Sequence, residues 1–157
     1  MGIRQAFVGL VTLGIVTMMT SCGVTAAPLS GIAISRDVSG RIVAHFALCP
    51  DELVQRVIVG IDTGDSTDPE WLIVGSGTAI GDVVVGSDPV GFDVRVDHPE
   101  VGWPGDIELV AESTSSRGDM GGVAFRFSDL PSGGRVNDNH SVAQWRESVL
   151  ASPGFCS

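Results

Sequence analysis

Val90-Gly91-Phe92-Asp93-Val94-Arg95-Val96-Asp97 is the clearest indication of fold in this chain of 157 residues. Every second residue from Val90 to Val96 is apolar, and the residues between Phe92 and Asp97 on the other face are charged. Because successive side chains of a β-strand point to opposite faces, this alternation predicts a strand with one face on a core and the other in solvent.

The same alternation recurs along most of the chain, so we expect seven or eight short strands. Twenty-one Gly and eight Pro supply the breaks between them. Short strands with turn residues at this spacing predict an all-β fold, a β-sandwich with a small barrel as the alternative, and one solvated face for each sheet. Besides 90–97, the expected strands cover 31–35, 41–48, 57–61, 71–74, 82–85, 106–112 and 122–128.

One short C-terminal helix is expected after these strands. Ser141 and Gln144 have the spacing of a capping box, and Ser152-Pro153-Gly154 ends the run. Trp145 lies on its apolar face, where we expect it to pack over an edge or end of a sheet. Trp71, at the start of a strand, is assigned to the core.

The N-terminal segment has the parts of a secretory signal. Arg4 precedes an uncharged, largely apolar run over 6–20, which is too short for a permanent membrane span. Met19-Thr20-Ser21-Cys22, which ends this segment, resembles the bacterial lipobox, with Met in place of the usual Leu. The chain is similar to short actinobacterial lipoproteins of uncharacterised function. This resemblance implies lipid attachment (palmitate and related chains) at Cys22.

The resemblance also implies an organisation for the chain. A signal peptide over 1–21 is removed, a lipidated tether follows over 22–30, and 31–157 form a single extracytoplasmic domain. The expected location is the outer face of the cell membrane. Ordinary secretion, with cleavage after Ala26 and loss of Cys22, is the alternative.

The other two cysteines, Cys49 and Cys156, form an even pair in the mature domain and predict a disulfide. Closing a loop of about a hundred residues stabilises a fold by about 4.7 kcal/mol in the chain-entropy treatment. The three His are scattered at His45, His98 and His140, without the spacing of a zinc site. We expect no metal and no cofactor, and we interpret His45 as a structural or surface residue.

Charge restricts the partners. All nine basic residues are Arg, and without Arg4 the remaining eight face nineteen Asp and Glu, a net charge of −11. A domain with this negative charge is not expected to bind nucleic acid, or to be attracted to anionic lipid. The expected partners are therefore the membrane, through the lipid anchor, and an envelope protein or small ligand.

Three local patterns suggest chemistry. Gly64-Asp65-Ser66 resembles the nucleophile block of GDS-type (SGNH) esterases, but Asp138-Asn139-His140 is one residue too tight for their late motif and the helices of their fold are missing. The carboxylates between Asp62 and Glu70 leave calcium binding open. Arg117-Gly118-Asp119 spells an adhesion tripeptide, which recurs by chance.

No convincing catalytic set is assembled. The sequence therefore favours a non-catalytic binding or interaction module, and a small envelope serine esterase using Ser66 is the alternative. Trp103 lies in a turn-forming stretch, where a buried position over an end of the sandwich is favoured over an exposed binding platform.

Overall fold

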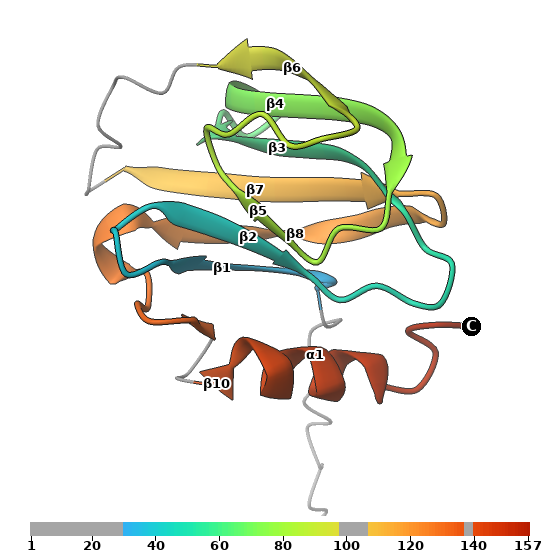
Figure 1. Cartoon of the computed structure of the whole chain (residues 1–157). Helices are drawn as coiled ribbons and strands as arrows, with labels where there is room; N and C mark the ends of the chain where they lie inside the picture. Colours follow the sequence, from blue (N-terminus) through green and yellow to red (C-terminus); the bar gives the residue numbers. More distant parts are fainter. Residues whose placement is uncertain (1–29, 98–106, 137–139) are drawn as a thin grey trace, which may run out of the picture.

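A computed structural model describes residues 30–97, 107–136 and 140–157. Most of this chain is in strands, as the alternating pattern predicts, and a single short α-helix follows them (Figure 1). In chain order the elements are β1 (Ile32–Arg36), β2 (Ile42–Phe46), β3 (Val54–Asp62), β4 (Thr67–Thr78), β5 (Asp82–Val84), β6 (Phe92–Asp97), β7 (Glu108–Ser115), β8 (Gly118–Arg126), a 3₁₀ turn (Phe127–Asp129), β9 (Arg135–Val136), β10 (His140–Ser141) and α1 (Val142–Leu150).

The strands form two facing antiparallel sheets, the predicted sandwich rather than a small barrel. The larger sheet has the order β6-β4-β3-β7-β8, the smaller has β1-β2-β5, and β9 pairs with β10 beside them. Every pairing within these sheets is antiparallel. Apolar residues from both sheets form the main core, among them Ile32, Phe46, Val59, Trp71 and Ile73, each at most 1% exposed.

Strands β4, β7 and β8 extend beyond the ranges that the sequence pattern predicts. The Ser/Gly-rich stretch between the expected strands 106–112 and 122–128 is itself part of β7 and β8, which meet at a tight turn at Ser116 and Arg117. Similarly, residues 67–69, which precede the expected strand 71–74, belong to β4. Both differences have one cause: a backbone ladder needs no apolar side chains, so polar residues extend a strand once its neighbour is in place.

Gly60 explains how β4 reaches this far. A Cβ built on Gly60 would lie 2.0 Å from the Asp68 carbonyl oxygen, at a register shift between β3 and β4. Only glycine permits this close approach of two backbones.

The expectation that each sheet has one solvated face is wrong for the smaller sheet. Its outer face is covered by α1 and β9, where Ala33 and Ala47 meet Val136, Trp145 and Val149 in a second apolar cluster. Figure 1 shows α1 lying along β1. Trp145, 6% exposed, therefore covers a sheet face rather than an edge or end. Ala33 and Ala47 have small side chains, which let α1 lie close to this part of the sheet.

A disulfide joins Cys49, shortly after β2, to Cys156, beyond α1, as the cysteine count predicts. The two positions are 107 residues apart in sequence, and their Cα atoms are 5.6 Å apart. No helix in the described part of the chain is long and apolar enough to cross a membrane. The predictions for Cys22, His98, Trp103 and Asp138 concern positions outside the described residues.

Candidate functional site

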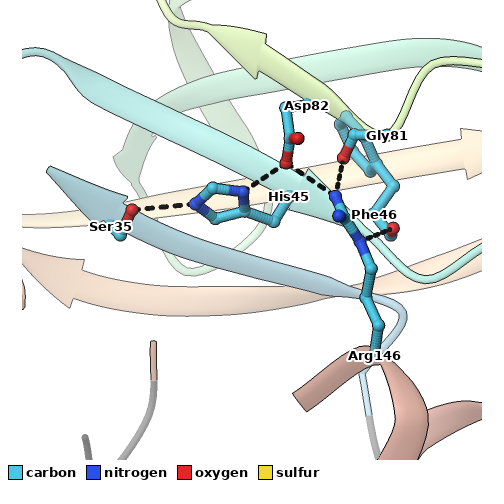
Figure 2. A network of polar contacts seen from close by, with 6 residues as sticks. All are labelled: Ser35, His45, Phe46, Gly81, Asp82 and Arg146. Carbon is cyan, nitrogen blue, oxygen red and sulfur yellow. Dashed lines mark hydrogen bonds and ion pairs between the residues drawn. The ribbon is translucent and has the colours of Figure 1, made fainter. Parts of the chain in front are cut away.

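His45 is the centre of a polar network on the outer face of the smaller sheet (Figure 2). Strand β2 lies between β1 and β5, and His45 is paired with Ala33 on one side and Asp82 on the other. This register places Ser35 diagonally across from the imidazole. His45 Nε2 lies 2.8 Å from Ser35 Oγ, and His45 Nδ1 is hydrogen-bonded to Asp82 Oδ1.

Arg146 of α1 completes the network. Its Nη2 lies 2.6 Å from Asp82 Oδ1 and also donates to the Gly81 carbonyl, while its Nε donates to the Phe46 carbonyl at 2.9 Å. The hydrogen bond from His45 and the charge of Arg146 hold the pKa of the Asp82 carboxyl below its usual value of 3.8. We call Ser35, His45, Asp82 and Arg146 the clasp.

The clasp has the Ser, His and Asp order of a hydrolase triad, with Nε2 toward the hydroxyl and Nδ1 toward the carboxylate. A nucleophile must reach a substrate, however, and Ser35 is only 1% exposed. The hydroxyl can either donate to His45 or accept from it, so the imidazole keeps both hydrogen bonds whether neutral or protonated. We therefore interpret the clasp as the attachment of α1 to the sheet.

The residues of the esterase prediction are placed differently. Ser66 lies in the exposed turn between β3 and β4, where its hydroxyl is 3.2 Å from Thr63 Oγ1. His140 is exposed and lies on β10. Among the contacts of the described residues, the histidine that bonds a serine is His45, and its partner is Ser35.

The acidic turn between β3 and β4, which also holds Ser66, is stabilised by local hydrogen bonds. Asp62 Oδ1 accepts from the Gly64 backbone N–H at 2.7 Å. Within the described ranges, no group of three or more His, Cys, Asp or Glu side chains is placed to hold a metal ion.

A second feature is an open pocket of about 840 Å³ at the other end of the β7 and β8 hairpin. We call it the Arg117 pocket. One wall is the hairpin end, another is the segment after α1, and Ser30 lies at its rim. Its lining residues include Ser30, Glu52, Ser115, Arg117, Asp119, Met120 and 152–155.

Glu52 ties the walls of this pocket together. It is 7% exposed, and its Oε2 accepts from the Cys49 backbone N–H at 2.8 Å while its Oε1 accepts from Ser115 Oγ. Cys49 carries the disulfide to Cys156, which follows the 152–155 wall. Both walls are therefore fixed by covalent and buried polar contacts, so the pocket is preformed.

The adhesion tripeptide belongs to this pocket. Arg117 Nη1 donates to the Cys156 carbonyl at 3.3 Å, and Asp119 Oδ1 accepts from the Gly121 backbone N–H at 2.8 Å. Both residues line the pocket, although the sequence alone gives the tripeptide no structural role. No signal in the sequence brings 115–122 and 152–155 together except the paired cysteines.

No protein-family model, curated protein or solved structure matches the chain.

Proposed function

We propose that this protein is a lipid-anchored component of the bacterial cell envelope that binds a ligand in the Arg117 pocket and performs no catalysis. The observation that carries the proposal is the position of Ser30. This residue is the last of the expected tether, the first residue that the structure describes, and a lining residue of the pocket.

Covalent geometry then sets the distance between pocket and anchor. Seven residues, 23–29, separate an acylated Cys22 from the first described residue, Ser30. A fully extended chain covers at most about 3.3–3.6 Å per residue, so Cys22 and Ser30 lie within about 30 Å of each other. A lipid on Cys22 therefore keeps the pocket beside the membrane surface.

Charge supports a covalent anchor. The domain carries a net charge of −11 once Arg4 is removed, so an anionic bilayer repels it. Acyl chains contribute about 0.8 kcal/mol for each buried CH₂, and two or more chains hold a protein stably at a bilayer. The lipid supplies the attachment that the acidic surface cannot.

The experiment compares detergent-phase partition of the native protein with Cys22→Ala. Ser21→Ala is the matched control, because alanine is an accepted residue at that position of the lipobox. We expect the native protein and the control in the membrane and detergent fractions, with an N-terminal peptide heavier by the mass of its acyl chains. We expect Cys22→Ala in the medium. Equal partition of all three variants contradicts the anchor.

Hydrolysis of short-chain p-nitrophenyl esters tests the absence of catalysis. We expect no turnover above the rate of Ser66→Ala or Ser35→Ala protein. Activity that is lost in either variant contradicts a binding-only function and identifies the nucleophile.

A further inference from the structure

We propose that the Arg117 pocket binds a polyhydroxylated ligand, a carbohydrate chain of the cell envelope. This inference rests on the proposed binding function and names the class of molecule bound. It is drawn from the polar groups, the apolar surface and the rigidity of the pocket.

Opposite charges lie side by side on the pocket wall. Arg117 and Asp119 are both exposed and are separated by one residue at the start of β8. Among the described residues, Arg117 makes one side-chain hydrogen bond, to the Cys156 carbonyl, and a guanidinium has five N–H donors. Asp119 uses Oδ1 for the Gly121 backbone and keeps acceptor capacity at Oδ2.

This pairing selects against simple charged ligands. Asp119 and the buried Glu52 repel an anion, and Arg117 repels a cation. A wholly apolar ligand would leave both charges desolvated without partners. A hydroxyl group satisfies both charges at once, because its hydrogen is donated to the carboxylate while its oxygen accepts from the guanidinium.

One serine of the pocket adds an acceptor. Ser152 Oγ donates to the Ser148 carbonyl at 2.9 Å, so its lone pairs remain for a ligand. Ser115 is buried, donates to Glu52 and accepts from the Arg117 backbone N–H at 3.1 Å, so it holds the pocket wall. Acceptors of this kind favour a ligand with many O–H donors. A peptide brings about as many backbone acceptors as donors and matches this lining less well.

An apolar surface adjoins the polar wall. Phe155 and Met120 line the pocket and lie against Gly31, where an added Cβ would be 3.2 Å from the Phe155 ring and 3.3 Å from the Met120 methyl. The C–H face of a sugar ring packs on such a surface. The pocket volume of about 840 Å³ lies within the usual range of about 300–1,000 Å³ for small-ligand sites.

Saturation-transfer NMR and calorimetric titration test the proposal on the full chain purified from membranes in detergent. The probes are maltotriose, mannotriose, galactotriose and chitotriose, with trialanine as the peptide probe. The variants are Arg117→Gln and Asp119→Asn. Arg126→Gln is the control, because Arg126 is an exposed arginine at the far end of the same strand, β8, and lies outside the pocket.

We expect at least one trisaccharide to bind, and both pocket variants to weaken it by about tenfold or more, since each removes a charged hydrogen-bonding partner. Arg126→Gln is expected to bind as the native protein does. Binding of trialanine alone, binding of no trisaccharide to the native protein, or trisaccharide binding unchanged in both variants would overturn the carbohydrate assignment. Membrane partition of native and Cys22→Ala protein is unaffected by any of these results and tests the anchor separately.

Discussion

Replacing Arg146 by Gln tests whether the clasp holds α1 on the sheet. The side chain makes two hydrogen bonds to backbone carbonyls, of Phe46 and Gly81, and an ion pair with Asp82. Hydrogen bonds from a charged group contribute about 1.5–3 kcal/mol when buried, but Arg146 is 28% exposed, which reduces this figure. The ion pair adds about 0.5 kcal/mol, since the Asp82 side chain is 53% exposed.

From these contributions we expect Arg146→Gln to lower the free energy of unfolding by about 2 kcal/mol. The matched control is Arg126→Gln. Arg126 and Glu108 are more than half exposed and their charged atoms are 3.8 Å apart, so this surface pair contributes at most about 0.5 kcal/mol. Urea unfolding followed by tryptophan fluorescence measures both variants, and Trp145 on α1 reports the helix directly.

Equal stabilities of the two variants would refute the argument. That result would mean that the apolar contacts of Trp145 and Val149 hold the helix without the clasp. A double variant with Asp82→Asn separates the ion pair from the carbonyl bonds. We expect most of the destabilisation in Arg146→Gln to come from the lost hydrogen bonds to the two carbonyls, and only about 0.5 kcal/mol to come from the lost ion pair with Asp82.

Three further outcomes follow from the same structure. The pKa of Asp82 is lowered in the folded state, so its charge stabilises the fold at pH values above 3.8, and this contribution is lost as the pH falls through the folded-state pKa. We therefore expect native protein to be more stable than Asp82→Asn at pH 7 and equally stable in strong acid. Urea titrations at both pH values measure this difference. A fluorophosphonate probe is expected to leave Ser35 unlabelled by mass spectrometry, because the hydroxyl is buried, and labelling would make the clasp an active site. Gly60→Ala is expected to prevent folding or to destabilise it by more than about 3 kcal/mol, since the added methyl meets the Asp68 backbone; a circular dichroism melt like that of the native protein would contradict the close approach.

The sequence predicts the strands and the helix well because their signals are local. Alternation over Phe92–Asp97 and the capping box at Ser141 both act within a few residues, and the structure confirms both. The capping box is complete, with Ser141 and Gln144 bonding each other's backbones. Strand ends were missed where polar residues continue a ladder, as in 113–121.

The clasp and the Arg117 pocket could not be predicted because their parts come from distant segments. His45 meets partners 10 and 37 residues away, and each of these residues alone has an ordinary surface pattern. The pocket joins Arg117 to a segment 39 residues later. Only the cysteine pair indicated this contact, and it gave no information about which side chains the pocket would contain.

The Cys49–Cys156 disulfide also determines how the domain responds to mechanical force. With the proposed anchor at Cys22, a pull between that anchor and Cys156 enters the domain at Ser30 and meets the covalent bond at Cys49. Only residues 30–49 can then be drawn out, a length of about 65 Å, whereas the unbridged chain would extend by several hundred. The chain between the two cysteines, which are 107 positions apart, contains Glu52, Arg117 and Asp119 and bears no tension along its backbone. Under the proposed anchoring, force on the envelope would therefore pull β1 and β2 away from the domain, while most of the wall of the Arg117 pocket keeps its shape.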